Sequence, residues 1–252
     1  MKRIDLFKQH LEEKRAVKVI AGIDNFDIER VINVVMAANQ TGASAIDICA
    51  DAEIVRNVRE LTELPLFVSS IIPQELARAV ELGADAVELG NFDILYKKGL
   101  RMDADEVLAL AKETMSLINS DETFVCVTVP GHISVAAQIE LARNLEAIGV
   151  NLIQTEGAAV ANVQSEGARG LLETAQVSIA NTIEIARNVE IPVMTASGIN
   201  STTAAMAFAA GASAIGVGSC INKLNSSIAM IATARGIVEI ANATSKPERV
   251  MV

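Results

Sequence analysis

The chain has 252 residues, close to the roughly 250 typical of one (β/α)8 barrel, and 51% of them are apolar. Its formal net charge of −10 argues against a nucleic-acid partner, which would need a basic surface. No apolar run reaches the roughly 18 residues of a membrane span, so no membrane partner is expected. The three cysteines lack metal-ligand spacing, which indicates a reducing compartment and no metal site.

Strand and helix patterns alternate along the whole chain. The first fifteen residues predict an amphipathic helix with Leu6, Phe7 and Leu11 on one face. Short apolar runs then predict eight strands, at 17–21, 45–49, 66–69, 86–89, 124–129, 152–155, 193–196 and 214–218. Helices are expected at about 27–40, from 51, from 73, from 103, at 134–148, 171–188, from 200 or 201, and at 226–241, before a polar tail. This alternation predicts a parallel α/β fold that forms a single domain over residues 1–252.

Every second strand is preceded by the same short phrase, a five-residue sequence motif. The motif consists of glycine, a small residue, any residue, alanine and an apolar residue. It occurs at 42–46, 83–87 and 211–215, with a weaker copy at 149–153. Pro65 and Pro192 introduce two of the other strands. This repeat is expected if one βαβ unit has been repeated around a closed barrel. The chain is therefore predicted to form a (β/α)8 TIM barrel with an N-terminal capping helix.

Charged side chains interrupt several apolar strands. The alternation of side chains points Lys18, Asp47 and Glu88 into the barrel, together with Cys49, Cys126, Thr128, Gln154 and Glu156. Because burial of an unpaired charge is costly, these residues need partners or a function. One interpretation is a polar plug in which Lys18 bridges the two carboxylates without chemistry. The other is a catalytic group with Asp47 and Glu88 as general acid and base.

The role of Lys18 depends on which effect sets the pKa of its amine. Desolvation would lower that pKa and suit Schiff-base chemistry, whereas the neighbouring carboxylates would raise it and leave a fixed cation. His132, after the fifth strand, is a candidate proton shuttle, with a helix-capping or surface role as the alternative. Ser69 ends the third strand and is a candidate ligand contact, although serine is also common in turns.

Two long loops are expected at the catalytic end of the barrel. Residues 91–101 carry a basic cluster at the end of the barrel where an anion should bind, although a solvated surface is the favoured interpretation for Lys97 and Lys98. Residues 156–170 form a loop longer than the roughly 2–6 residues usual at this position. The second loop suits a lid over a ligand or a contact in a homodimer.

Glycine turns after the last two strands predict a phosphate site. Ser197 and Gly198 follow the seventh strand, Gly218 and Ser219 follow the eighth, and Asn222 is expected to open a short extra helix. Backbone N–H groups at such turns bind phosphate in (β/α)8 barrels. The alternative is that the glycines only permit close packing.

Four phrases resemble one known family. They are AVKVIAGIDNFD (16–27), IDICAD (46–51), LPLFVSS (64–70) and AVELGNFD (86–93), and they are similar to the hypothetical chloroplast open reading frame 23 family of cyanobacteria and algal plastids. The resemblance implies a TIM-barrel-like fold in the cytoplasm or the plastid stroma, and it supplies no catalytic residue. Residues 193–219 alone resemble the phosphate sites of tryptophan- and histidine-biosynthesis barrels, N-acetylmannosamine-6-phosphate epimerase and thiazole synthase.

Three functions are compatible with this pattern. The first is a lyase, isomerase or epimerase that acts on a small phosphorylated metabolite without a cofactor. The second is an oxidoreductase that binds flavin mononucleotide (FMN) at the same strands. The third is a regulator that binds a phosphorylated metabolite without turnover.

Overall fold

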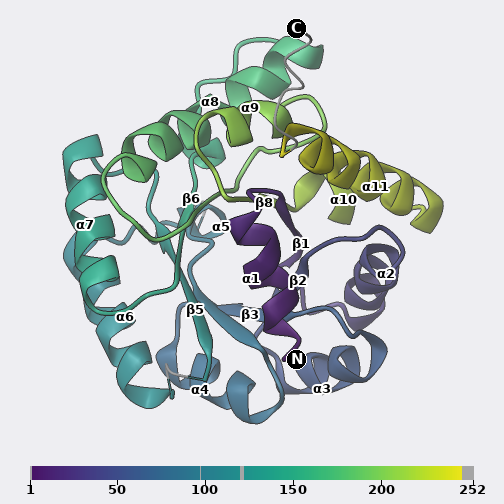
Figure 1. Ribbon diagram of the computed structural model, residues 1–252, viewed down its shortest axis with the longest axis horizontal. Coiled ribbons are helices and arrows are strands. Elements are labelled where there is room, and N and C mark those ends of the chain that lie inside the picture. The colour runs from purple at the N-terminus through teal and green to yellow at the C-terminus, as the bar shows by residue number, and fades with distance from the viewer. Residues whose placement is uncertain (1, 97, 120–121, 246–252) are drawn as a thin grey trace, which may run out of the picture.

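Eight parallel strands form a closed barrel in chain order (Figure 1). The computed structural model describes residues 2–96, 98–119 and 122–245, so Lys97 and most of the expected polar tail lie outside the described residues. The strands are β1 Ala16–Gly22, β2 Ala45–Cys49, β3 Leu66–Ser70, β4 Ala86–Leu89, β5 Phe124–Val129, β6 Leu152–Thr155, β7 Val193–Thr195 and β8 Ala214–Val217. β8 pairs with β1, which places Lys18 beside Gly216 and closes the ring. The predicted (β/α)8 barrel is confirmed.

Helices surround the barrel and follow the strands in the expected alternation. Asp27, Asp51, Asp103 and Ser134 cap four of them by accepting hydrogen bonds from backbone N–H groups, which explains why the sequence located these starts. The long helices are α1 Ile4–Glu12, α2 Ile28–Ala38, α3 Ala52–Leu61, α4 Pro73–Glu81, α6 Ala104–Leu117, α7 Val135–Ala147, α8 Gly167–Ala186 and α11 Ser227–Thr244. Shorter elements are α5 Asp93–Tyr96, η1 Ala158–Val160, α9 Ala204–Ala209 and α10 Ser219–Asn222. No helix within the described ranges has both the length and the apolar character needed to span a membrane.

Three predictions of helix boundaries were wrong. α8 begins at Gly167 rather than near 171, and no side chain caps it, so its start has no sequence signal. The helix after β7 begins at Ala204, because residues 201–203 form a turn first. Asn222 ends α10 instead of opening it, and its Nδ2 donates to the carbonyl oxygens of Ile20 at 3.1 Å and Ala21 at 3.2 Å.

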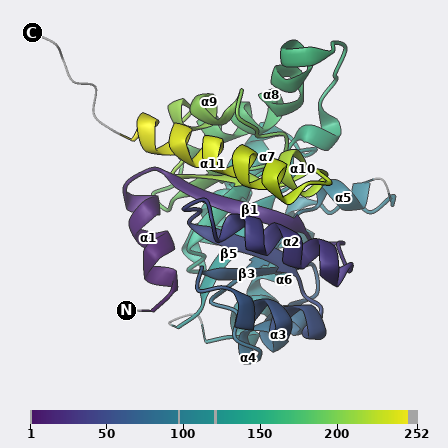
Figure 2. The same cartoon turned by 90° about the vertical axis from the view of Figure 1, so that its right-hand side faces the viewer.

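α1 covers the N-terminal end of the barrel, opposite to α5 (Figure 2). Phe7 of α1 is fully buried, and its ring meets the rings of Phe67 and Phe124 edge-on, with centroids 4.9 and 5.8 Å apart. Such edge-to-face aromatic contacts are favourable and suit a dry core. This end of the barrel is therefore filled with apolar side chains, and polar side chains gather farther along the strands.

The repeated phrase ahead of the even strands has a structural purpose. Its third residue donates its backbone N–H to a carbonyl of the preceding odd strand, at 2.8–2.9 Å for Ser44, Asp85, Asn151 and Ser213. In three of these four copies the side chain also accepts a hydrogen bond from a backbone N–H of that preceding strand, at 2.7–3.0 Å. The phrase therefore joins neighbouring strands at the base of the barrel and belongs to the scaffold.

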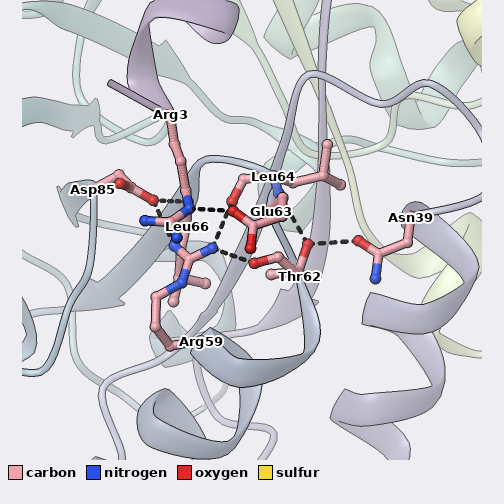
Figure 3. A network of polar contacts seen from close by, with 8 residues as sticks. All are labelled: Arg3, Asn39, Arg59, Thr62, Glu63, Leu64, Leu66 and Asp85. Atoms are coloured by element: carbon pink, nitrogen blue, oxygen red, sulfur yellow. Dashed lines mark hydrogen bonds and ion pairs between the residues drawn. The ribbon is translucent and has the colours of Figure 1, made fainter. Parts of the chain in front are cut away.

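Asp85 is the centre of a polar network at this same end (Figure 3). Arg59 Nη1 lies 2.6 Å from Asp85 Oδ2, and the guanidinium also donates to the carbonyl oxygen of Thr62. Beside it, Nε of Arg3, the residue directly before α1, pairs with Glu63 Oε2 at 2.8 Å. These contacts hold α1, α3 and β4 together far from the carboxyl ends of the strands.

Candidate functional site

A layer of polar side chains lies inside the barrel, on the C-terminal side of the Phe67 ring. Lys18, Asp47 and Glu88 are fully buried, and Lys18 Nζ lies 5.1 Å from the centroid of the Phe67 ring. The alternation explains this placement, since Val17 and Val19 on either side of Lys18 pack toward the helices. Six expected side chains meet in this polar layer, namely Lys18, Asp47, Ser69, Glu88, Thr128 and Gln154.

Glu88 is the hub of the layer. Its Oε2 forms a salt bridge with Lys18 Nζ, and its Oε1 accepts from Gln154 Nε2 at 2.7 Å and from Asn91 Nδ2 at 3.0 Å. Gln154 Nε2 also lies 3.0 Å from Thr128 Oγ1. Glu88 is therefore committed to protein partners through both oxygens, which suits a group that positions Lys18.

Asn91 joins this layer although no pattern in the sequence singled it out. Its Nδ2 also donates to Ser69 Oγ at 3.2 Å, and Ser69 Oγ in turn donates to Asp47 Oδ1 at 2.5 Å. Asn91 has a φ of 63°, a left-handed conformation that asparagine tolerates better than most residues. A β-carbon at Gly90 would overlap Thr128. The pair Gly90-Asn91 directly after a strand is therefore the signal that could have identified this contact.

Two buried acceptor atoms in the layer have no hydrogen-bond partner among the described residues. They are Asp47 Oδ2 and Gln154 Oε1. The amide of Gln154 is oriented by its nitrogen, which contacts a carboxylate and a hydroxyl, so its oxygen must point the other way. That oxygen faces Gly216, where a β-carbon would lie 3.4 Å from it.

The charges inside the barrel determine the protonation of the layer. Burial by itself would lower the pKa of Lys18, but the Glu88 and Asp47 carboxylates outweigh it and raise that pKa above its usual value. Burial and the neighbouring Glu88 raise the pKa of Asp47 to about 7, against the opposing effect of Lys18. Lys18 is thus a fixed cation, and Asp47 can exchange a proton near neutral pH.

His132 and Glu156 lie in a second cluster at the mouth of the barrel. Glu156 Oε1 accepts from the Tyr96 hydroxyl, and Tyr96 lies 2.9 Å from His132 Nδ1. Glu156 Oε2 accepts from the backbone N–H of Asp93 at 3.0 Å. Burial and the Asp93 charge raise the pKa of Glu156 to about 8, and burial lowers the pKa of His132. His132 and Glu156 therefore belong to this second cluster. Like Asn91, Tyr96, the only tyrosine of the chain, is a site residue that sequence reasoning missed.

The expected phosphate turns are formed by backbone at the ends of β7 and β8. Gly198 has a φ of +84°, and a β-carbon there would lie 2.9 Å from the Thr174 carbonyl oxygen, so the turn requires glycine. Ser197 Oγ accepts from the backbone N–H of Ala158 at 2.9 Å and is hydrogen-bonded to the Asp93 carboxylate. Gly218 is half-buried and Ser219 is exposed at the start of α10. The basic cluster predicted on the 91–101 loop is only partly described, since Lys97 falls outside, and Lys98 is exposed and 3.9 Å from Asp24.

The sequence matches one protein family along almost its whole length. The family described as a protein of unknown function (DUF561) matches residues 2–248. The chain belongs to this family. The uncharacterized protein ycf23 of Cyanophora paradoxa is 41% identical over 230 residues, 91% of this chain and 92% of that relative. Its counterpart in Pyropia yezoensis is 33% identical over 219 residues, 87% of this chain and 80% of that relative. The family resemblance found in the four sequence phrases is confirmed.

Solved structures share the fold at low sequence identity. Thiamine phosphate pyrophosphorylase from Pyrococcus furiosus superposes with a TM-score of 0.58 and 20% identity, covering 93% of this chain and 98% of that one. The 3-hexulose-6-phosphate synthase from Salmonella typhimurium superposes with a TM-score of 0.64 and 14% identity, covering 91% and 99%. Within the described residues, no group of three or more His, Cys, Asp or Glu side chains is arranged to hold a metal ion.

Proposed function

We propose that the chain is an enzyme that performs lyase, isomerase or epimerase chemistry on a small phosphorylated metabolite. The observation that carries this proposal is the buried layer around Lys18, in which Asp47 Oδ2 and Gln154 Oε1 have no partner among the described residues. A plug that served only stability would pair all its polar atoms, because each unpaired buried group costs about 1–3 kcal/mol. The partnerless atoms favour a layer that is completed by a ligand.

Two side chains of the layer suit distinct roles in such chemistry. Lys18, kept cationic by Glu88 and Asp47, stabilises negative charge that develops on a substrate carbonyl oxygen when an adjacent carbon loses a proton. Asp47, with a pKa of about 7, gives or takes that proton. The raised pKa of Lys18 argues against the Schiff-base alternative, which needs a neutral amine.

Phosphate binding at the β7 and β8 turns completes the proposal. Ser197, Gly198, Gly218 and Ser219 offer backbone N–H groups and hydroxyls at the mouth of the barrel, and the first turns of helices attract anions. Two solved structures with this fold have names that refer to phosphorylated compounds, a hexulose phosphate and thiamine phosphate. These names concern those proteins, and they support phosphate here only by analogy.

Exchange of substrate protons for deuterium tests the proton-transfer step by itself, whatever the complete reaction is. The protein is incubated in D2O with phosphorylated ketones and aldoses, and loss of the C–H signal next to the carbonyl is followed by proton NMR. We expect exchange with at least one phosphorylated compound and not with its dephosphorylated form. Lys18→Met and Asp47→Asn should each slow the exchange at least about 100-fold.

Lys223→Met is the matched control, because Lys223 is exposed just after α10 and its loss changes the net charge by the same amount. Exchange that proceeds at the wild-type rate in Lys18→Met contradicts the proposed role of the layer. Tight binding of a phosphorylated compound without any exchange favours the regulator over the enzyme. Borohydride should trap no adduct on Lys18, and a trapped adduct that disappears in Lys18→Met would restore the Schiff-base mechanism.

A further inference from the structure

Three side chains at the mouth of the barrel form a hydrogen-bonded chain that the proposed chemistry of the buried layer does not use. Tyr96, His132 and Glu156 follow three neighbouring strands, β4, β5 and β6. His132 Nδ1 lies 2.9 Å from the Tyr96 hydroxyl, and that hydroxyl contacts Glu156 Oε1. Glu156 is 2% exposed, whereas His132 is only half-buried. The chain therefore leads from an accessible imidazole to a buried carboxyl group.

The hydroxyl in the middle of this chain has one proton and two partners, so its direction fixes the state of both neighbours. Where Tyr96 donates to an ionised Glu156, its oxygen accepts from His132, and the imidazole proton is on Nδ1. Where Glu156 carries a proton on Oε1, it donates to Tyr96, and the Tyr96 hydroxyl donates to His132 Nδ1. The imidazole proton is then on Nε2. The ring is neutral in both arrangements, and they differ in the tautomer of His132 and in one proton on Glu156.

We propose that His132, Tyr96 and Glu156 form a proton relay, in which the buried Glu156 carboxyl group stores a proton that is exchanged at His132 Nε2. When Nε2 accepts a proton from a ligand, the Nδ1 proton moves to the Tyr96 oxygen. The Tyr96 hydroxyl proton then moves to Glu156 Oε1. The ligand loses one proton and Glu156 gains one, and neither an imidazolium nor a tyrosinate remains. The same steps in reverse return the proton to the ligand.

The charges around the relay favour a neutral imidazole above a protonated carboxyl group. Among the described residues, the charged groups that act on it are Asp93 of α5 and Arg101 of the loop before α6. Burial and Arg101 lower the pKa of His132 from 6.5, against the effect of Asp93. Burial and Asp93 raise the pKa of Glu156 to about 8, and burial and Glu156 raise that of Tyr96. Between about pH 6.5 and 8, the ring is therefore neutral while Glu156 is protonated.

The relay lies beside one of the proposed phosphate turns. Glu156 Oε2 accepts from the backbone N–H of Asp93, and the Asp93 carboxylate is hydrogen-bonded to Ser197. Glu156 also follows Gln154 of the buried layer by two residues, which corresponds to about 6–7 Å in an extended segment. The use of the relay in catalysis rests on the proposed function. Asp47 would exchange the proton of a carbon atom in the layer, and His132 that of a ligand oxygen nearer the phosphate.

The tautomer of His132 tests the relay directly, because the chain has only two histidines. The protein is labelled with nitrogen-15 in histidine, and the ring nitrogens are followed by NMR between pH 6 and 9. We expect the proton of the neutral His132 ring on Nε2 below about pH 8 and on Nδ1 above it, so the shifts of the two nitrogens exchange places. His10 is the internal control and should keep one neutral tautomer, because its partner Ser44 accepts from the backbone N–H of Val17 instead of contacting a carboxylate.

Three variants locate the switch in the relay. Tyr96→Phe removes the bridging hydroxyl, and Glu156→Gln removes the titrating group, so each should abolish the exchange of tautomers near pH 8. Asp93→Asn is the matched variant, because it removes a neighbouring charge and keeps all three members of the relay. The switch should persist in Asp93→Asn with its midpoint at a lower pH, since the Asp93 charge raises the pKa of Glu156. The His10 signals report whether each variant is folded.

The outcomes separate the relay from the proposed function. A neutral His132 ring with the same tautomer on both sides of pH 8 overturns the relay, and so does a switch that persists in folded Tyr96→Phe. The measurement on the wild-type protein decides the matter even if a variant does not fold. A switch without deuterium exchange in any phosphorylated compound supports the relay and counts against the proposed function. Deuterium exchange without a switch overturns the relay and leaves the proposed function standing.

Discussion

Removal of the cation from the buried layer is the most informative perturbation of this protein. In Lys18→Met the long apolar stem is kept and the charge is lost, while Glu88 and Asp47 stay buried beside each other. Loss of one partner from a buried pair costs about 3–5 kcal/mol, because an uncompensated charge remains. We therefore expect the free energy of unfolding at pH 7 to fall by about 3–5 kcal/mol.

The double variant Lys18→Met/Glu88→Gln separates the cost of an uncompensated buried charge from the contribution that the ion pair makes to the free energy of unfolding. Glutamine keeps an acceptor for Gln154 Nε2 and Asn91 Nδ2, and the uncompensated charge on residue 88 disappears. Replacement of a buried ion pair by neutral groups is often close to neutral for stability, so the double variant should recover to within about 1 kcal/mol of the wild type. It should nevertheless remain inactive in the deuterium-exchange assay.

Urea unfolding at pH 7 measures these differences, provided that the slope against denaturant is the same for all variants. A loss below about 1 kcal/mol in Lys18→Met would refute the electrostatic argument. A double variant as unstable as the single variant would also refute it, since the loss would then come from packing. Recovery of stability together with loss of exchange would show that the layer serves function rather than folding.

Two further predictions concern the mouth of the barrel. Folding raises the pKa of Glu156 from 4.5 to about 8. Between these pH values the native state therefore holds a proton that the unfolded chain has released. The free energy of unfolding should fall as pH rises through this window, by about 5 kcal/mol at most. Glu156→Gln should remove this part of the fall, and parallel unfolding curves for variant and wild type between pH 5 and 9 would contradict the assignment. Gly90→Ala should lower the free energy of unfolding by at least about 2 kcal/mol, because its β-carbon would overlap Thr128. Gly99→Ala is the control and should lower it by about 1 kcal/mol, since a β-carbon there meets no atom within 4 Å. Similar losses for both variants in thermal or urea unfolding would rule out the steric explanation.

The interior layer was accessible from the sequence because strands impose a strict period of two. Once Val17 and Val19 face the helices, Lys18 has to face the barrel, and the same holds for Asp47, Glu88 and Gln154. Helix starts were equally accessible where an aspartate or a serine caps the first turn. Both signals are local, so they do not depend on the tertiary structure.

The mouth of the barrel was less accessible because loops follow tertiary contacts. The alternation of side chains along β6 predicts that Glu156 points into the barrel. Its carboxylate instead contacts Tyr96 and the backbone of Asp93, which both follow β4. Nothing in the spacing of the sequence joins residues 63 positions apart in two loops. The same limit applies to Asn91, whose entry into the buried layer depends on one left-handed residue.

The loop after β4 links two events that the barrel otherwise separates. Asp93 places a carboxylate on Ser197, the residue at which the proposed phosphate must arrive, and two anions cannot share one hydroxyl donor at low cost. If the proposed phosphate binds at Ser197, it would compete with Asp93 for this hydroxyl, and a shift of α5 would carry Asn91, two residues earlier, away from Glu88 and Ser69. In that case the phosphate group would change the arrangement of the buried layer as well as hold the ligand. A substrate fragment without phosphate would enter a barrel whose reactive layer is still held in its resting arrangement.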